Sequence, residues 1–208
     1  MQKRFFKGET AMTSSEYYRN LLPENERDFF PYMPTINELV SFALEHFAQE
    51  IALDGKAGPV TYLEMQDHIA GLRGFLRRQG IQAGDKVGIQ LPNCAMAAEL
   101  ILAAMTFGAV IVPFPMTMDG DELANNLKKM DIRLFIYADM LEARVSAVQA
   151  PDGLAKLPLS QVAYSDPAPE GKTEKETPAA IFFTGGTTGR SKGAVLSHGA
   201  LIDRKSVV

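Results

Sequence analysis

Several residue types that define common classes of protein are scarce or absent in this sequence. The chain of 208 residues contains no tryptophan and one cysteine, Cys94, so no disulfide can form within it. This favours a reducing compartment over a disulfide-rich secreted scaffold. We expect Cys94 to be a small core residue at the head of a helix. The three histidines, His46, His68 and His198, show no metal-ligand spacing, so we predict no metal site from them.

Positive charge is not in excess either. The chain has 21 lysine and arginine residues against 25 aspartate and glutamate residues, a net charge of −4. We therefore expect no nucleic-acid partner, because nucleic-acid-binding domains usually carry a basic surface. The 46% hydrophobic and 22% charged content is typical of a folded globular protein. The length suffices for one good-sized domain with a real core.

Long apolar runs are also missing. The most apolar stretch, residues 95–114, contains Glu99, Gly108 and Pro113, and it divides naturally into a helix and a following strand. The basic N-terminal residues 3–7 flank too few apolar residues for a signal peptide. We therefore expect a cytoplasmic protein without a transmembrane segment.

Two capping-box patterns predict the starts of helices. Thr35 with Glu38, and Thr61 with Glu64, each precede apolar residues at helical spacing. The second of these helices carries three basic residues near its end, which suit the helix dipole and which we interpret as solvated: Arg73, Arg77 and Arg78.

Strands and helices are predicted to alternate along most of the chain. We expect strands at residues 51–53, 86–91, 109–112 and 132–137, and further helices at 95–105, from Asp119 or Asp121 to Met130, and at 139–149. Residues 151–178 are rich in proline and charge, which predicts a loop region with one strand around residues 157–163. The alternation predicts an α/β fold, a parallel-rich sheet with flanking helices, preceded by an irregular arm over residues 1–34.

The most informative stretch is residues 180–198. An apolar, strand-like run leads into a loop of glycines and threonines, and a second apolar run leaves it. Glycines let successive backbone N–H groups converge on an anion, while threonine hydroxyls and Lys192 add donors and positive charge. This predicts a polyphosphate site at Thr184, Gly185, Gly186, Thr187, Thr188, Gly189 and Lys192. The alternative is a glycine-rich hairpin between two buried strands, with Lys192 merely exposed.

The pattern differs from the Walker A loop of kinases and GTPases. That loop has glycine immediately before its lysine, serine or threonine immediately after it, and a helix at its exit. Here Ser191 precedes Lys192, Gly193 follows it, and the exit has the pattern of a strand. A Walker A loop is therefore excluded at three points.

Residues 182–198, FFTGGTTGRSKGAVLSH, resemble the signature loop of the adenylate-forming (AMP-binding) enzymes. This superfamily includes acyl-CoA synthetases, the adenylation domains of peptide synthetases and firefly luciferase. Its usual loop reads Thr-Ser/Gly-Gly-Ser/Thr-Thr-Gly-x-Pro-Lys-Gly, and residues 184–193 match it except at Ser191, where the family usually has proline. Serine in place of proline affects the rigidity of the loop more than its contacts with phosphate.

Two earlier segments also resemble the family. In residues 58–93, a Thr-Tyr dipeptide opens a long helix, and Gly-Asp-x-Val leads into a strand that ends in Leu-Pro-Asn. Residues 103–115, AAMTFGAVIVPFP, resemble the next family segment, although Thr106 and Phe107 depart from its usual Lys-Ala-Gly-Ala centre. The resemblance covers roughly residues 35–201.

The resemblance implies a function as well as a fold. It identifies residues 35–208 as an incomplete N-terminal domain of an acyl-CoA synthetase-like enzyme, which activates a carboxylic acid with ATP and transfers the acyl group to coenzyme A. It also implies a role in fatty acid metabolism. The catalytic lysine and the residue associated with Mg²⁺ belong to later parts of such enzymes, so no catalytic or metal-binding residue is assigned here, and we expect this chain alone to be inactive. The Gly185-Gly186 form of the loop leans toward acyl-CoA synthetases. A peptide-synthetase adenylation domain and a noncatalytic phosphate-binding protein stay open as alternatives.

The last six residues, 203–208, read Asp-Arg-Lys-Ser-Val-Val. They coincide with the translation of a common sequencing-adapter read. We therefore expect that the natural gene continues and that this end is an assembly artefact. The alternative is an ordinary basic tail.

Overall fold

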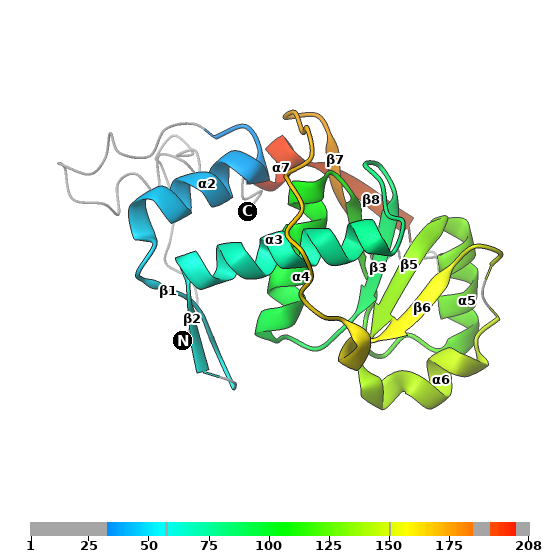
Figure 1. Ribbon diagram of the computed structural model, residues 1–208. Coiled ribbons are helices and arrows are strands. Elements are labelled where there is room, and N and C mark those ends of the chain that lie inside the picture. Colours follow the sequence, from blue (N-terminus) through cyan, green and yellow to red (C-terminus); the bar gives the residue numbers. More distant parts are fainter. Residues whose placement is uncertain (1–32, 57, 150, 185–191, 203–208) are drawn as a thin grey trace, which may run out of the picture.

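A six-stranded sheet forms the centre of the protein (Figure 1). The computed structural model describes residues 33–56, 58–149, 151–184 and 192–202. The strand order is β6 (Ala155–Pro158), β5 (Ile132–Tyr137), β3 (Lys86–Gln90), β4 (Val110–Pro113), β7 (Pro178–Thr184) and β8 (Lys192–Ser197). All neighbouring pairs are parallel except β7 and β8, which are antiparallel. The predicted parallel-rich α/β fold is confirmed.

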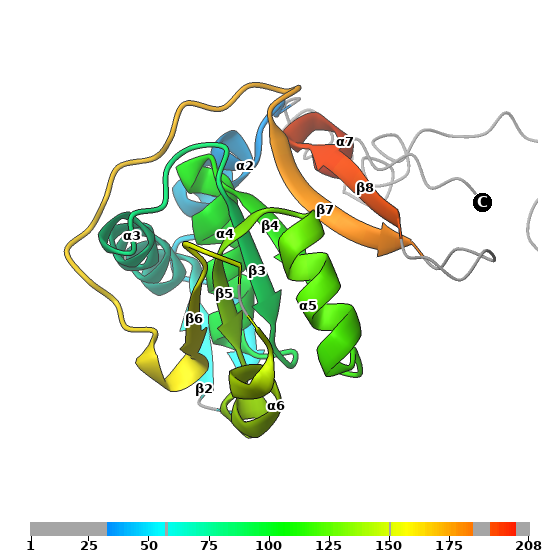
Figure 2. The same cartoon turned by 90° about the vertical axis from the view of Figure 1, so that its right-hand side faces the viewer.

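Helices cover both faces of this sheet. Side chains alternate along each strand, so Leu134 and Ile136 of β5 join one core cluster while Phe135 and Tyr137 join the other. The first cluster lies under α3 (Tyr62–Arg78) and α4 (Ala95–Phe107), with α2 (Ile36–Phe47) packed against both. The second lies under α5 (Gly120–Lys129) and α6 (Glu142–Ala147). Figure 2 shows α4 and α5 on opposite sides of the sheet.

Both predicted capping boxes are present. The Thr35 hydroxyl accepts a hydrogen bond from the Glu38 N–H (3.3 Å), and the Glu38 carboxylate accepts one from the Thr35 N–H (3.0 Å). Thr61 and Glu64 repeat the arrangement at the start of α3. These local bonds satisfy N–H groups that the first turn of a helix leaves without partners. They therefore fix where α2 and α3 begin.

The other predicted elements are mostly confirmed. Asp119 caps α5, β5 has the predicted bounds, and the helix expected at residues 139–149 is a 3₁₀ turn, η2 (Asp139–Leu141), followed by α6. The strand expected around residues 157–163 was misplaced, because β6 ends at Pro158 and the 3₁₀ turn η3 (Leu159–Gln161) follows. A separate hairpin of β1 (Ile51–Gly55) and β2 (Gly58–Thr61) precedes α3. The arm predicted over residues 1–34 lies almost entirely outside the described residues.

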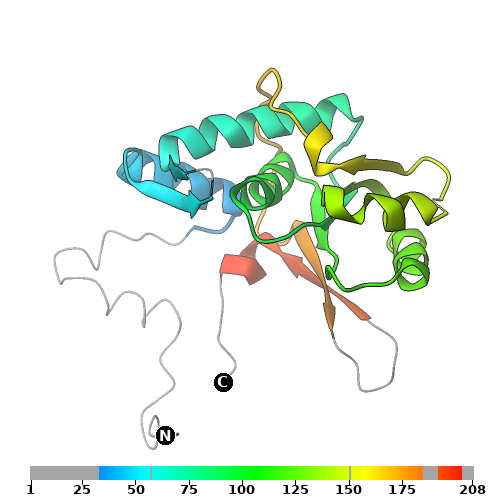
Figure 3. The same cartoon turned by 90° about the horizontal axis from the view of Figure 1, so that it is seen from below.

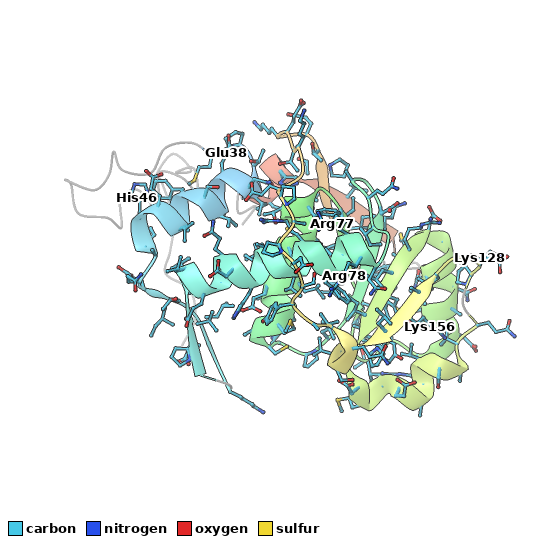
Figure 4. The ribbon with its side chains drawn as sticks, in the orientation of Figure 1. Glu38, His46, Arg77, Arg78, Lys128 and Lys156 are labelled. Carbon is cyan, nitrogen blue, oxygen red and sulfur yellow. The ribbon has the colours of Figure 1, made fainter. Side chains whose placement is uncertain are left out.

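Two residue predictions are wrong. Cys94 lies at the head of α4, as predicted, but it is exposed, because the turn in which the chain leaves the sheet lies outside both core clusters of the described residues. Arg73 is buried, with 7% of its surface exposed, because another part of the chain crosses over it. Arg77 and Arg78 are exposed, as predicted (Figure 4). Among the described helices, none combines the length and apolar character needed to cross a bilayer.

The segment that covers Arg73, residues 162–177, is called the strap below. It runs outside α3 and α4 from the β6 edge of the sheet toward β7 (Figure 1). The N–H of Ser165 donates to the carbonyl of Gly71 (3.2 Å), and the N–H of Gly171 donates to the carbonyl of Thr106 (2.8 Å). The strap is therefore held to the helices by backbone hydrogen bonds.

Arg73 supplies a polar contact beneath the strap. Its Nε donates to the Ala168 carbonyl (2.9 Å), one terminal nitrogen donates to the Thr106 hydroxyl (3.2 Å), and the Glu170 carboxylate lies 3.7 Å away. Burial lowers the pKa of Arg73, and the nearby Glu170 opposes that shift. A buried charge is costly unless it is paired and hydrogen-bonded, and here it is both.

His198 links the two ends of the described chain. It begins α7 (His198–Ile202), is fully buried, and its Nδ1 accepts a hydrogen bond from the N–H of Ile36 at the start of α2 (3.1 Å). Its Nε2 has no hydrogen-bond partner among the described residues. Burial lowers the pKa of His198, so the neutral form is favoured in the folded state.

The close contact between the strap and α3 predicts that a side chain added at Gly74 destabilises the fold. A Cβ at Gly74 of α3 would lie 2.0 Å from the Asp166 carbonyl oxygen. Gly74→Ala should therefore lower the free energy of unfolding by about 1–3 kcal/mol, although alanine is the better helix former. Gly120→Ala is the control, because its Cβ would meet only Val148 at 3.7 Å. Chemical denaturation of both variants checks this, and a stabilised Gly74→Ala would contradict the close approach.

The buried His198 predicts a dependence of stability on pH. A histidine whose folded pKa is below its unfolded value of 6.5 takes up a proton preferentially when the protein unfolds. The free energy of unfolding should therefore decrease as the pH falls below 6.5, by at most about 1.4 kcal/mol per pH unit from this group. His198→Asn should remove this contribution, whereas His46→Asn on the exposed surface of α2 should not (Figure 4). If the free energy of unfolding depends on pH identically in the wild type and in His198→Asn, this prediction is refuted.

Candidate functional site

The predicted phosphate-binding residues lie at and between two adjacent strand ends. Thr184 ends β7, Lys192 begins β8, and the two residues are cross-strand partners. The other candidates, Gly185, Gly186, Thr187, Thr188 and Gly189, lie outside the described residues. The assignment of all seven residues to a phosphate site stays a prediction. The exit from the loop is a strand, which agrees with the exclusion of a Walker A loop.

These strand ends lie at the carboxyl edge of the parallel sheet. Because β7 is parallel to β4, Thr184 is at the edge where β3, β4 and β5 also end. After β3 the chain enters α4 on one face, and after β4 it enters α5 on the other. In open α/β sheets, ligands bind outside the carboxyl ends of the strands where connections diverge in this way. The loop therefore begins one strand away from the position where this rule expects a ligand.

The β7–β8 hairpin extends away from the rest of the sheet (Figures 2 and 3). The backbone ladder between β4 and β7 is confined to Ile111 and Ala180, whereas the ladder between β7 and β8 continues to Thr184 and Lys192. Phe182 is 41% exposed and Val195 is 60% exposed. The distal part of the hairpin is therefore positioned mainly by side-chain packing on its inner face.

Two polar pairs occupy the neighbouring part of the carboxyl edge. The Tyr137 hydroxyl donates to the Glu142 carboxylate (2.8 Å), and burial together with that carboxylate raises the pKa of Tyr137 to about 12. Asp139 accepts a hydrogen bond from the Ser160 hydroxyl, which lowers the pKa of the Asp139 carboxyl. Each pair is satisfied internally and joins neighbouring turns. We therefore interpret these groups as structural.

Gln90 at the end of β3 was not identified from the sequence. It is fully buried, and its Nε2 donates to the Pro115 carbonyl (2.7 Å) in the turn after β4. This bond fixes two adjacent strand ends relative to each other. Its only sequence signal is a single amide within the apolar run of residues 87–91, and this pattern does not show which strand end the amide contacts. Its role is to position backbone at the edge where the loop begins.

The described residues place the two ends of the predicted loop side by side. The chain enters and leaves the loop through adjacent strands at the sheet edge, because Thr184 and Lys192 are cross-strand partners. Within residues 33–56, 58–149, 151–184 and 192–202 there is no group of three histidine, cysteine, aspartate or glutamate side chains that could hold a metal ion.

A family model described as AMP-binding enzyme matches residues 41–207. The chain is 31% identical over 143 residues to a feruloyl-CoA synthase of Amycolatopsis sp., an alignment that covers 68% of this chain and 29% of that enzyme. It is 28% identical over 170 residues to the vanchrobactin synthetase VabF of Vibrio anguillarum, covering 82% of this chain and 6% of the synthetase.

A solved structure shares the fold. ATP-bound MatB from Rhodopseudomonas palustris superposes with a TM-score of 0.72 at 24% identity, covering 80% of this chain and 35% of MatB. The chain thus spans well under half the length of each of these three proteins. The family match extends over most of the chain and includes the loop between β7 and β8. This chain therefore belongs to the AMP-binding enzyme family.

Proposed function

We propose that this chain is part of an acyl-CoA synthetase, which activates a carboxylic acid to an acyl-adenylate with ATP and then transfers the acyl group to coenzyme A. The observation that carries the proposal is the family loop, held between the paired ends of β7 and β8 at the carboxyl edge of the sheet. Backbone N–H groups, threonine hydroxyls and Lys192 are the donors that bind the β- and γ-phosphates of a nucleotide.

The role of the loop in this reaction is positioning and neutralisation. The acid attacks the α-phosphate of ATP and pyrophosphate leaves, so a group that holds the β- and γ-phosphates holds the leaving group. Mg²⁺ would supply further charge neutralisation when bound, and we assign no ligand for it to this chain. The catalytic lysine and most of the acyl pocket would belong to residues beyond this chain, so we propose that it is inactive by itself.

The similarity to feruloyl-CoA synthase favours coenzyme A as the acceptor. The similarity to the vanchrobactin synthetase supports a second candidate, an amino-acid adenylation domain that passes its product to a carrier domain. Carrier-domain sequence downstream in the same gene would favour the second candidate. We further propose a cytoplasmic location and a place in fatty acid metabolism.

Exchange of labelled pyrophosphate into ATP tests the proposed reaction. The complete gene product should catalyse this exchange with at least one acid from a panel of aliphatic acids, aromatic acids and amino acids, since acyl-adenylate formation is reversible. Dependence on an acid distinguishes an adenylate-forming enzyme from a noncatalytic phosphate-binding protein. A folded protein that binds ATP but exchanges no pyrophosphate with any acid would defeat the proposal.

Lys192 provides the sharpest test of the loop on this chain. Lys192→Ala should weaken binding of ATP and of inorganic tripolyphosphate by about 10- to 100-fold, the loss expected for one charge-assisted hydrogen bond. Lys128→Ala is the matched control, because it makes the same change of charge on the exposed surface of α5 (Figure 4). Titration calorimetry with both ligands provides the measurement. Unchanged affinity in Lys192→Ala would instead support the glycine-rich hairpin.

A further inference from the structure

We propose that Phe114 is a positioning residue for the phosphate loop, because its ring holds the β7–β8 hairpin at the point where the loop begins. The link between Phe114 and catalysis rests on the proposed function. The structural content of the inference is independent of that function, since it concerns only residues that the structure describes.

The hairpin needs such a contact because its backbone is attached to the parallel sheet near one end. The ladder from β4 reaches β7 at Ile111 and Ala180, and beyond this pair the hairpin extends away from the sheet (Figures 2 and 3). The ladder between β7 and β8 keeps the two strands together, but it does not fix the pair relative to β4. Side chains must therefore position residues 182–184.

The ring of Phe114 makes this contact. Phe114 directly follows β4 and is 4% exposed, and its ring centroid lies 5.1 Å from that of Phe183 with an interplanar angle of 57°. Phe183 directly precedes Thr184 and pairs with Gly193, which directly follows Lys192. A shift of Phe183 would therefore move both strand ends from which the loop extends.

Phe114 is itself held firmly by the sheet. Its N–H donates to the Ile89 carbonyl (2.7 Å), and its ring meets the ring of Phe135 edge-on at 5.4 Å. The ring occupies space left by a missing side chain, because a Cβ at Gly88 would lie 3.0 Å from its edge. The bond from Gln90 to the carbonyl of Pro115 fixes the following residue. The ring thus fixes the hairpin relative to β3 and β4.

A second contact holds β8 from the same side. A Cβ at Gly193 would lie 2.8 Å from Ile181 and 2.9 Å from the terminal methyl of Met130, which follows α5. The inner face of the hairpin therefore packs against the cluster that contains Phe114 and Phe135. Phe114 is the aromatic member of this cluster that touches the residue next to the loop.

The experiment compares Phe114→Leu with Phe75→Leu in the full chain. Phe75 is 3% exposed and lies in α3 on the opposite face of the sheet, so its substitution makes the same chemical change away from the hairpin. Hydrogen exchange should accelerate at the amides of residues 182–184 and 192–194 in Phe114→Leu only. Affinity for ATP and tripolyphosphate should decrease by up to about tenfold in Phe114→Leu and stay unchanged in Phe75→Leu.

Phe183→Leu removes the same contact from a less buried position and replaces Phe114→Leu if that variant does not fold. Equal exchange at these amides in the hairpin variant and in Phe75→Leu would overturn the inference. Faster exchange with unchanged triphosphate affinity would also overturn it, because the contact would then not position the site. A wild-type chain that binds no triphosphate would count against the proposed function, while hydrogen exchange would still decide whether Phe114 holds the hairpin.

Discussion

The close approach of the strap to α3 and α4 is the constraint on which the rest of the structure depends. Between β6 and β7 the chain passes from one edge of the sheet to beyond β4, four strand spacings or roughly 19 Å. It does so over the helices, at a distance that only glycine permits. A Cβ at Gly74 would lie 2.0 Å from the Asp166 carbonyl oxygen, and one at Gly171 would lie 2.2 Å from the Phe107 carbonyl oxygen. Because Gly74 and Gly171 have no side chains, the strap can pass close to the helices, and β7 can then lie beside β4.

Polar contacts then fix the strap in one register. Arg73 donates to the Ala168 carbonyl from below, and the Asn37 side chain of α2 donates to the Glu170 carboxylate (3.0 Å) and to the Thr106 carbonyl (3.1 Å). A shift of the strap would leave the buried Arg73 without the Ala168 carbonyl as an acceptor, which costs more than the bond itself contributes. One buried network therefore joins α2, α3, α4 and the strap, and so determines where β7 begins.

In the proposed function, the loop depends on these contacts because it would bind phosphate mainly through backbone N–H groups. Donors that converge on a phosphate must be held within a fraction of an ångström, and they inherit their position from the strands on either side. Here β7 is placed at one end by the strap and by the hydrogen bond from the His198 N–H to the Thr177 carbonyl (3.0 Å), and at the other by the contact between Phe114 and Phe183. In the proposed function, these contacts keep in place the strand ends from which the loop that holds the leaving group would extend.

The sequence by itself determined the elements whose signals are local. The capping boxes at Thr35 and Thr61 form bonds within four residues, and the bounds of β5 follow from one apolar run between turn signals. The family loop could likewise be identified, because its glycines, threonines and lysine are contiguous.

The tertiary structure alone decided which side chains are covered. Arg73 lies near the end of a helix, where a solvated charge is expected, and cysteine is often a core residue. The strap nevertheless buries Arg73, whereas Cys94 is exposed among the described residues. Likewise, no local pattern shows that Gln90 and Phe114 fix neighbouring strand ends. Their partners are distant in the sequence or lie on another strand, and burial depends on what the rest of the chain brings to that place.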